Sequence, residues 1–454
     1  MIIDVYFALP TPLRSPRTMK KIFWYGLLAL NMIAIIAIWY TRSSYYIQNP
    51  EDGNILKALG RLAGLFAEVA ILLELLLIGR ITVIEQTFGH DKMNKIHRWI
   101  GYSILLFMLG HPILLTMASA QANGYTFYQQ FADFLANGED IFAAFVSIIL
   151  FAYIIVLSLP IIRKRLRYET WYFTHLLVYL AIGLAFSHQI ESGDVSVAPY
   201  LYYWLVLNFT VFGVMLFYRL IKPLLNAWRF EFRVADVTME TKDTYSIYIK
   251  GKNIEQFSYQ AGQFANITFL QKGLWYSHPF SFSVEPNTNC VRFTIKALGD
   301  YTKRLGELKV GTRVILDGPL GLFVDKAALR DKLLLIAGGI GITPIRALIG
   351  HLVTEKKDFV LMYAARTPED IAFRAEFEEF QKIHPFTIHY IMSAPTEGYE
   401  SGFIDREKLV RLTPDFYDRD VYLCGPPPMM TATVKNLEGL GVPIKNIHFE
   451  KFSF

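Results

Sequence analysis

The first half of the chain consists of long apolar runs separated by short polar stretches. Each run is close to the about 20 residues that a helix needs to cross about 30 Å of hydrocarbon. The runs are residues 22–40, 59–78, 96–117, 141–161, 171–187 and 201–220. The first run has a long apolar core and no small-x-small site after it, which favours an uncleaved helix over a signal peptide. The pattern predicts an all-α bundle of six transmembrane helices.

The pattern changes after Lys222 and Pro223. From Phe230 onward, short stretches alternate apolar and polar residues, as in EFRVADVTM, YSIYIKG and VRFTIKAL, which is typical of a small antiparallel β-barrel. After about Asp325, apolar runs such as LLLIAGG, DFVLMYAA and DVYLCG alternate with helical stretches, which predicts a parallel α/β sheet. The sequence therefore predicts a multidomain membrane protein with three domains: 1–222, 223–325 and 326–454.

Charge is distributed as unevenly as hydrophobicity. Among the first 221 residues 29 are charged, against 56 of the remaining 233, and only the second proportion is near the about 25% of soluble domains. This difference excludes a disordered chain, a fibrous protein and a single soluble domain. The net charge of +5 gives no reason to expect a nucleic-acid partner. Two cysteines cannot form a disulfide framework and suit a reducing compartment.

Lysine and arginine are concentrated in the loops on one side of the predicted membrane. They precede the first run and lie between the second and third and between the fourth and fifth: Arg14, Arg17, Lys20, Lys21, Arg80, Lys92, Lys95, Arg98, Arg163, Lys164, Arg165 and Arg167. On the other side, residues 119–140 and 188–200 contain neither lysine nor arginine. The positive-inside rule then predicts a multi-pass protein of the cytoplasmic membrane with both termini in the cytoplasm.

Four histidines lie within or at the ends of two predicted helices. His97 and His111 are fourteen residues apart on the third helix, and His175 and His188 are thirteen apart on the fifth. Ionisable residues inside a membrane are costly and therefore mark candidate functional sites. Each spacing corresponds to about 20 Å along the helix axis. Because both helices run the same way, His97 shares its depth with His175, and His111 with His188.

Two neutral imidazoles that face each other can hold one haem iron. The two pairs therefore predict two stacked b-type haems with the four histidines as metal ligands; the alternative is that they are core histidines bonded to their neighbours. A spacing of fourteen returns to within about 40° of the same helix face, whereas thirteen misses by about 140°. The fifth helix then needs a distortion, for which Gly183 is a candidate, or its haems approach from different sides.

Three charged residues lie in the second predicted helix. The acids Glu68 and Glu74 could form interior ion pairs or a proton path. Arg61, near the outer end, could bind a haem propionate or attract an anion. For all three, simply holding the bundle together is an equally good explanation.

A glycine-rich loop is the strongest single motif of the second half. LLLIAGG runs into Gly339-Ile340-Gly341-Ile342-Thr343-Pro344, and a helical stretch follows. Glycines let the backbone approach a pyrophosphate, and a helix N-terminus supplies N–H groups and a favourable dipole. Pro344 replaces the third glycine of the usual dinucleotide fingerprint and suits a first helical turn. The loop predicts a dinucleotide site.

Two later strands end in residues that fit the same site. Arg366 directly follows the predicted strand DFVLMYAA. A basic residue at this place can bind the 2′-phosphate of NADPH, whereas an acidic one would favour NADH. The alternative is that Arg366 is only a surface charge. Cys424-Gly425-Pro426 ends the last strand, at the edge of the sheet where ligands bind. Cys424 either lines the nicotinamide pocket or is a small buried apolar residue.

Together these features resemble the NADPH oxidase and ferric reductase family over nearly the whole chain. His278-Pro279-Phe280-Ser281 is similar to the family's flavin motif, and Gly299 and Thr302 match the motif near the FAD pyrophosphate. The Gly339–Pro344 loop, Arg366 and Cys424-Gly425-Pro426 match the NADPH motifs. The resemblance implies FAD, two haems b and NADPH as cofactors. In the family an aromatic residue near the C-terminus stacks on the flavin, which maps to Phe452, two positions after Glu450, with Phe454 as a lesser candidate.

The function implied by the resemblance is transmembrane electron transfer from cytosolic NADPH, through FAD and the haems, to an acceptor outside. O₂, giving superoxide, is favoured because the short outer loops carry no obvious metal-ligand cluster. A ferric-chelate reductase with the same electron path is the alternative. A cytochrome b carrier that serves a quinone or a protein is a further alternative of another class, against which the built-in flavin and NADPH modules count. No calcium-binding domain precedes the first helix, so we expect activity without an obligatory protein partner.

Overall fold

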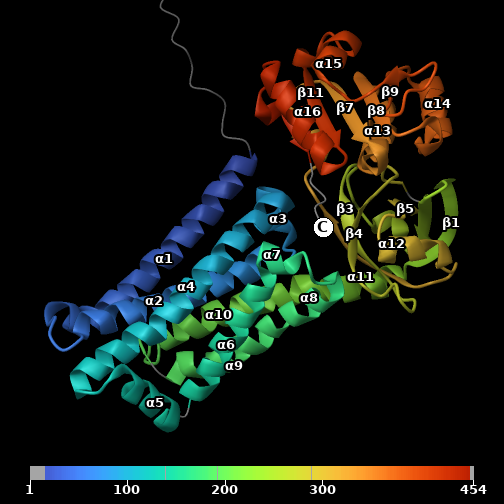
Figure 1. Ribbon diagram of the computed structural model, residues 1–454. Helices are drawn as coiled ribbons and strands as arrows, with labels where there is room; N and C mark the ends of the chain where they lie inside the picture. Colours follow the sequence, from blue (N-terminus) through green and yellow to red (C-terminus); the bar gives the residue numbers. More distant parts are fainter. Residues whose placement is uncertain (1–15, 139, 192, 288, 450–454) are drawn as a thin grey trace, which may run out of the picture. The chain divides into compact units, whose positions relative to one another are not determined.

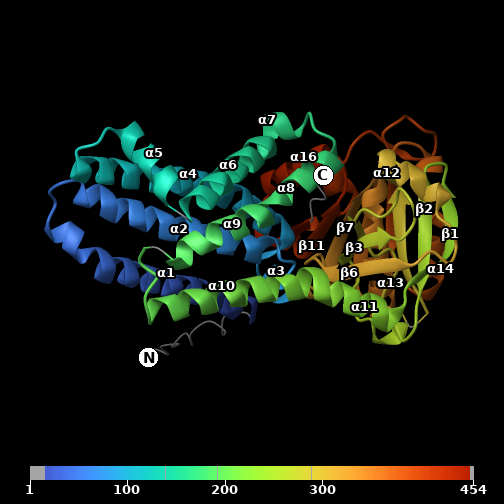
Figure 2. The same cartoon turned by 90° about the horizontal axis from the view of Figure 1, so that it is seen from below.

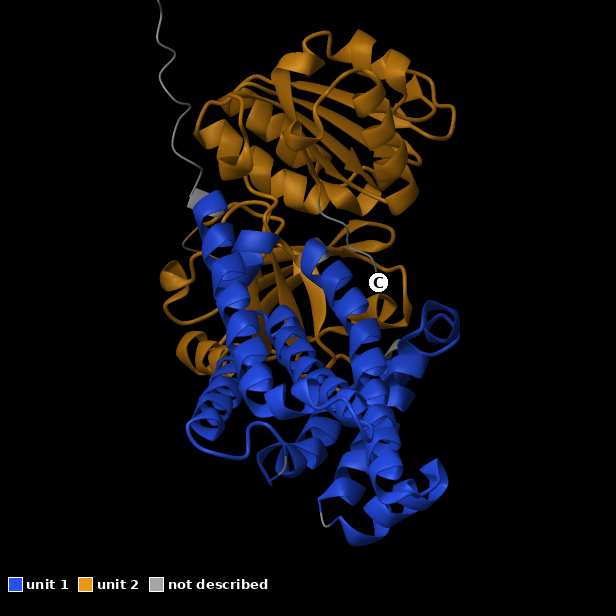
Figure 3. Ribbon diagram, turned by 90° about the vertical axis from the view of Figure 1, so that its left-hand side faces the viewer, with its two compact units in different colours: residues 1–88, 92–216 blue, residues 89–91, 217–454 orange. Residues whose placement is uncertain are grey.

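Apolar helices make up the first half of the chain, in a computed structural model that describes residues 16–138, 140–191, 193–287 and 289–449. The chain divides into two units (Figure 3): residues 1–88 with 92–216, and residues 89–91 with 217–454. The long helices of the first unit are α1 (Pro16–Gln48), α2 (Asn54–Ile78), α4 (His90–Asn123), α6 (Ile141–Ser158), α9 (Leu177–Glu191) and α10 (Tyr200–Leu216). The shorter ones are α3 (Thr82–Phe88), α5 (Phe127–Asn137), α7 (Pro160–Arg163) and α8 (Tyr168–His175).

Among the described residues, five helices are long and apolar enough to cross a membrane, and α2 with α3 would make a sixth across a 90° bend. The predicted set of apolar helices is therefore present, whereas the count of six stays a prediction. In the bundle, α9 lies against α6 and α10 lies against α2 (Figures 1 and 2). Small and aliphatic side chains of α2, α4 and α9 form its main buried cluster.

The predicted fifth transmembrane helix is interrupted, which is one of the two arrangements that the thirteen-residue histidine spacing leaves open. The interruption falls at Leu176, between α8 and α9 and directly after His175. Gly183 lies inside the unbroken α9. The distortion was therefore predicted in the correct helix but at the wrong residue.

Two antiparallel sheets begin the second unit, each of three strands. One has the order β1-β2-β5 and the other β4-β3-β6. The strands are β1 (Arg233–Thr241), β2 (Thr244–Lys250), β3 (Phe264–Phe269), β4 (His278–Ser281), β5 (Val291–Lys296) and β6 (Val314–Leu320). Isolated bridges, Arg233 to Arg313 and Phe282 to Phe293, connect the sheets around one shared apolar core. Antiparallel pairing is as predicted, whereas closure into a barrel stays a prediction.

A six-stranded parallel sheet follows, with the order β10-β9-β8-β7-β11-β12. Its strands are β7 (Lys332–Gly338), β8 (Phe359–Ala365), β9 (Thr387–Met392), β10 (Glu400–Ser401), β11 (Arg419–Cys424) and β12 (Ile447–Phe449). In β7, Leu333 and Leu335 pack into one apolar cluster, and Leu334 and Ile336 pack into another. Burial on both faces explains why the sequence of this strand is continuously apolar.

Helices cover both faces of the parallel sheet. The helices α13 (Ile342–Thr354) and α14 (Arg374–Ile383) contribute to one buried cluster. The helices α15 (Arg406–Leu412) and α16 (Pro427–Gly439) contribute to the other (Figure 1). The sequence predicts the parallel α/β sheet, and the structure adds that helices cover both of its faces. The two remaining α-helices, α11 (Lys222–Phe230) and α12 (Asp300–Lys303), precede and follow parts of the antiparallel sheets. The predicted limits of the three domains stay predictions.

Candidate functional site

Two turns meet at the point where the strand order of the parallel sheet reverses. From β7 the chain continues to β8 and β9 on one side, whereas β11 and β12 lie on the other. In open α/β sheets, ligands bind outside the carboxyl ends of the strands at such a point. Ala337 of β7 is paired with Cys424 of β11. The sheet therefore brings together the glycine-rich loop and the Cys424-Gly425-Pro426 turn, which are far apart in the sequence.

The close approach of these two turns depends on glycine. A Cβ atom at Gly341 would collide with the carbonyl group of Cys424 and the amide nitrogen of Gly425. Gly339 differs, because it adopts a φ of +50° and no heavy atom of the described chain lies within 4 Å of its Cβ position. Glycine is needed there for its backbone conformation. The loop is thus tightly packed on one side and open on the other.

The other predicted residues of this site lie at the same edge of the sheet. The Thr343 hydroxyl donates a hydrogen bond of 3.0 Å to the carbonyl of Ile340, and Pro344 follows in the first turn of α13, where its missing N–H has no helical partner to lose. Arg366 is exposed and directly follows β8. Cys424 is buried in the apolar cluster that also contains residues of α13.

The flavin motif His278–Ser281 forms β4, an edge strand. Pro279 lies opposite Asn266 of β3, and an edge strand tolerates the absence of a proline N–H. The His278 ring lies 3.9 Å from the ring of Tyr301, centre to centre. Because Tyr301 belongs to the turn that holds Gly299 and Thr302, the structure brings the two predicted flavin motifs together.

The side chain of Thr302 stabilises the turn in which it lies. Its hydroxyl oxygen accepts hydrogen bonds from the amides of Gly299, at 2.9 Å, and Leu298, at 3.0 Å. Glu450, Phe452 and Phe454 lie outside the described residues. The described chain ends in β12, which pairs in parallel with β11.

In the first unit, the four histidines lie in the two predicted pairs. The ring centres of His97 and His175 are 6.3 Å apart, and those of His111 and His188 are 6.1 Å apart. An imidazole nitrogen binds a first-row metal at about 2.0–2.1 Å and lies about 1.1 Å from its ring centre, so two rings on opposite sides of one metal have centres about 6.2–6.4 Å apart. The spacing of both pairs fits one iron between the rings.

The Nδ1 atoms of the first pair contact protein oxygens. Nδ1 of His97 contacts the carboxylate of Glu74 on α2. Nδ1 of His175 lies 3.3 Å from the hydroxyl oxygen of Ser158. That hydroxyl already donates its hydrogen to the carbonyl of Ile154, at 2.8 Å, so it accepts from the His175 ring.

The second pair is held in the same way. Nδ1 of His111 lies 2.8 Å from the carbonyl oxygen of Gly60, and Nδ1 of His188 lies 2.8 Å from Oδ2 of Asp140. A Cβ atom at Gly64, one helical turn after Gly60, would lie 2.6 Å from the same His111 nitrogen. The small residues of α2 therefore allow the His111 ring to reach the backbone.

The four partners assign one tautomer to all four rings. Carbonyl and carboxylate oxygens only accept, and the Ser158 hydroxyl donates its hydrogen to Ile154, so each Nδ1 carries the hydrogen and each Nε2 carries the lone pair. Histidines that bind metals almost always donate their second N–H to such an oxygen. The donor set therefore fits bis-histidine haem iron, with Nε2 as the ligand atom.

Sequence reasoning missed the oxygen partners. The sequence marks Glu74 as a candidate for an interior ion pair but does not identify His97 as its partner. Nothing in the sequence marks Asp140 or Ser158, because they stand at the start and the end of an ordinary apolar helix. Arg61 and Glu68, the other two charged residues singled out in α2, have their own partners among the described residues. Arg61 pairs with Asp194, and the carboxylate of Glu68 accepts a hydrogen bond of 2.8 Å from Gln189.

Comparison with known proteins identifies all three parts of the chain. Residues 63–186 match the family model of the ferric reductase like transmembrane component. Residues 229–322 match an FAD-binding domain, and residues 335–435 match an oxidoreductase NAD-binding domain. The chain is a ferric-reductase/NADPH-oxidase-like fusion. The fusion is therefore an oxidoreductase with a membrane-embedded part and a flavin- and nicotinamide-binding part.

Individual relatives of the fusion match its reductase part. A glycine betaine monooxygenase reductase subunit of Chromohalobacter salexigens is 29% identical over 238 residues, covering 49% of this chain and 64% of the relative. A flavohemoprotein of Bacillus subtilis is 30% identical over 234 residues, covering 49% and 58%. The fusion thus spans less than two thirds of the length of these relatives. A solved ferredoxin reductase of carbazole 1,9a-dioxygenase is 28% identical with a TM-score of 0.45, covering 49% of this chain and 68% of that chain.

Replacing Gly341 with alanine should weaken NADPH binding by about tenfold or more, because the new Cβ collides with backbone atoms that cannot move aside. The measurement is the dissociation constant for NADPH of the purified, FAD-loaded protein. FAD content should stay unchanged, since the flavin motifs lie on other strands. Gly213→Ala is the control, because nothing lies within 4 Å of that Cβ position. Unchanged NADPH affinity in Gly341→Ala would contradict the assigned role of the turn.

Proposed function

We propose that the fusion carries electrons from cytosolic NADPH, through FAD and two bis-histidine haems, to an acceptor on the far side of the cytoplasmic membrane. The main support is the shared tautomer of the four paired histidines, whose ring spacings suit one iron each. The matches to an FAD-binding and an NAD-binding domain support a nicotinamide cofactor and FAD as the source of the electrons. The basic loops support a cytoplasmic location for both termini.

Four residues would hold the haems: His97 with His175, and His111 with His188. Each bound haem would supply reversible one-electron chemistry. The Nδ1 partners fix each ring in the orientation and tautomer that an axial ligand needs. With two protein ligands for each iron, no coordination position would remain for the acceptor, so O₂ or a ferric chelate would take up an electron without binding iron; O₂ would leave as superoxide.

The nucleotide-binding residues have distinct tasks in this proposal. Gly339 and Gly341 let the pyrophosphate approach the N-terminus of α13, whose dipole favours the negative charge. Arg366 would bind the 2′-phosphate that distinguishes NADPH from NADH. His278–Ser281 and the Gly299–Thr302 turn would hold FAD. Cys424 would lie beside the nicotinamide, and Phe452, after Glu450, would cover the flavin.

Ferric chelates are the second candidate acceptor. The observation in their favour is that residues 63–186 match the ferric reductase like family model. The electron path is the same in both cases, so the difference concerns only the outer surface. A cytochrome b carrier that serves a quinone or a protein is less well supported, because the fusion carries its own FAD and NAD domains.

Substitution of one ligand and of its partner should have different effects on haem. His188→Ala should lower the haem content of the purified protein from about two to about one per chain, because one iron loses an axial ligand. Asp140→Asn should retain both haems and raise one midpoint potential by on the order of tens of millivolts, because a carboxylate on Nδ1 makes the imidazole more basic. Haem assays and a redox titration measure these results. Retention of both haems in His188→Ala would refute the ligand assignment.

Replacing Arg366 should reduce the preference for NADPH over NADH. Arg366→Ala removes the cation proposed to pair with the 2′-phosphate, so kcat/KM for NADPH should fall by about tenfold while that for NADH changes little. Arg330→Ala is a matched control, because Arg330 lies in the segment before β7 and contacts the backbone of Tyr417 and Arg419. An unchanged ratio between the two nucleotides would show that Arg366 is only a surface charge.

The acceptor can be identified with the detergent-solubilised protein and added FAD. NADPH-driven cytochrome c reduction in air should be largely abolished by superoxide dismutase if O₂ is the acceptor. Fast reduction of ferric citrate under argon, with no effect of dismutase in air, would instead support the metalloreductase. If NADPH reduces neither acceptor although dithionite reduces the haems, the carrier function would gain support.

A further inference from the structure

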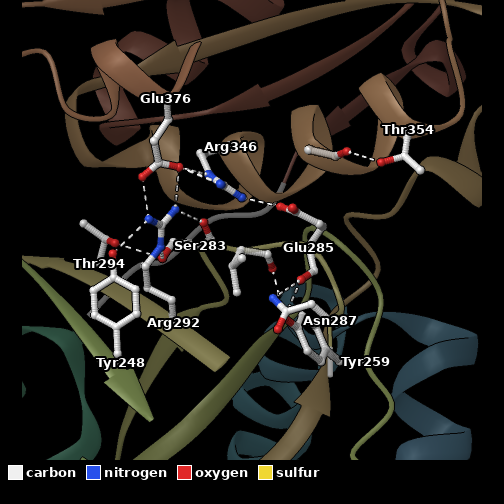
Figure 4. Close-up of polar contacts among 12 residues, drawn as sticks. Tyr248, Tyr259, Ser283, Glu285, Asn287, Arg292, Thr294, Arg346, Thr354 and Glu376 are labelled. Carbon is white, nitrogen blue, oxygen red and sulfur yellow. Dashed lines mark hydrogen bonds and ion pairs between the residues drawn. The ribbon is translucent and has the colours of Figure 1, made fainter. Parts of the chain in front are cut away.

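Four charged side chains meet where the flavin-binding and nucleotide-binding parts of the second unit join (Figure 4). Arg292 lies on β5, and Glu285 lies in the segment between β4 and β5. Both fall within the FAD-binding match. Arg346 lies on α13 and Glu376 on α14, within the NAD-binding match. Each part therefore contributes one arginine and one glutamate.

The contacts run in both directions across the joint. Arg292 binds both carboxylate oxygens of Glu376, at 2.5 and 3.1 Å. Arg346 binds Glu376 through Nε, at 2.6 Å, and also contacts the carboxylate of Glu285. The four residues thus form a continuous chain in the order Glu285, Arg346, Glu376 and Arg292. Two-point arginine–carboxylate contacts fix direction as well as distance.

Burial makes this chain of charges sensitive to geometry. The side chains of Arg292 and Arg346 are only 4% and 8% exposed. Those of Glu376 and Glu285 are 30% and 28% exposed. Arg292 is further held by the carbonyl of Ser283, at 2.7 Å. Burial alone would raise the pKa of Glu376, but the hydrogen bond from Arg292 and the charges of both arginines bring it below the ordinary 4.5. Glu376 is therefore ionised at neutral pH.

Stability alone is a weak explanation for such an arrangement. Well-packed apolar residues often stabilise a protein as much as a buried ion pair does, since desolvation offsets much of the attraction. A directional ion pair differs from apolar packing because it specifies one relative position. The joint is therefore better suited to fixing a geometry than to increasing stability.

The joint also connects directly to both cofactor motifs. Arg346 lies two residues after Pro344, in the helix whose first turn follows the glycine-rich loop. Glu285 lies four residues after Ser281, the last residue of the flavin-motif strand. A Cβ atom at Gly350, one turn beyond Arg346, would collide with the Glu285 carboxylate. The pyrophosphate-binding helix is therefore attached at this joint to the segment that follows the flavin motif.

We infer that Glu285, Arg292, Arg346 and Glu376 are positioning residues for hydride transfer from NADPH to FAD. They fix the nucleotide-binding part against the flavin-binding part and so set the approach of the nicotinamide to the flavin ring. This inference rests on the proposed function. An error of about 1 Å in such an alignment can reduce a rate by about a hundredfold.

Two variants disturb the joint in independent ways. Glu285→Gln removes the negative charge and keeps the shape of the side chain. Gly350→Ala keeps every charge, but its new methyl group displaces the flexible Glu285 carboxylate from Arg346. Glu255→Gln is the control, because Glu255 is an exposed glutamate of the flavin-binding part.

Anaerobic stopped-flow reduction of the FAD-loaded, full-length protein by NADPH measures the step directly. In both variants, the rate constant of flavin reduction should fall by about tenfold or more, while NADPH affinity and FAD content stay within about twofold of the parent. The long-wavelength charge-transfer absorption between nicotinamide and flavin should weaken in parallel. Glu255→Gln should behave as the parent.

Three results would overturn the inference. The first is a parental rate constant in both variants, and the second is an effect in only one of them. The third is a loss of FAD or NADPH binding that accounts for the slower reduction, which would indicate a purely structural joint. Failure of the proposed function would look different, because NADPH would not reduce the flavin of the parent protein either.

Discussion

The contact of an oxygen atom with Nδ1 of each paired histidine is the interaction on which the transmembrane unit depends. An imidazole held at one nitrogen by an acceptor presents its lone pair at the other, in the tautomer and orientation that suit metal binding. The acceptors belong to α2, to the end of α6 and to Asp140, just before α6. Helices without paired histidines therefore orient those on the helices that carry them. This explains why the bundle needs polar atoms at these depths.

The second unit uses a comparable division of tasks. Backbone geometry forms the nucleotide site, since Gly341 packs against the Cys424 turn at the reversal point of the sheet. Charged side chains act one layer away, where Arg346 and Arg292 meet carboxylates from the opposite part. In both units, residues that would touch a cofactor are held by residues that would not. Rigid support of this kind is what electron and hydride transfer require, because both depend steeply on distance.

The sequence predicted those features that depend on local pattern. The histidine spacing gave the pairing of His97 with His175, and the period of apolar residues gave the antiparallel and parallel sheets. The sequence could not identify Asp140 as the partner of His188, because 48 residues separate them and an acidic residue before an apolar helix looks like an ordinary helix start. The break at Leu176 was equally hidden, since nothing in that residue disfavours a helix.

The carboxylates of the two histidine pairs also have an electrostatic consequence. Each pair has one imidazole with a carboxylate partner, His97 or His188, and one with a neutral partner, His111 or His175. The iron–porphyrin core of a ferric haem with two neutral ligands carries one net positive charge, not counting its propionates, and such a charge is costly in a low-dielectric interior. One carboxylate in each pair would offset that charge, and a bound haem would in turn make the burial of the carboxylate less costly. Because both pairs share this arrangement, it would lower the potentials of both proposed haems. A difference between the two potentials would then come from unlike neighbours, such as Arg61, which lies on the same helix as Gly60, the partner of His111, and pairs with Asp194.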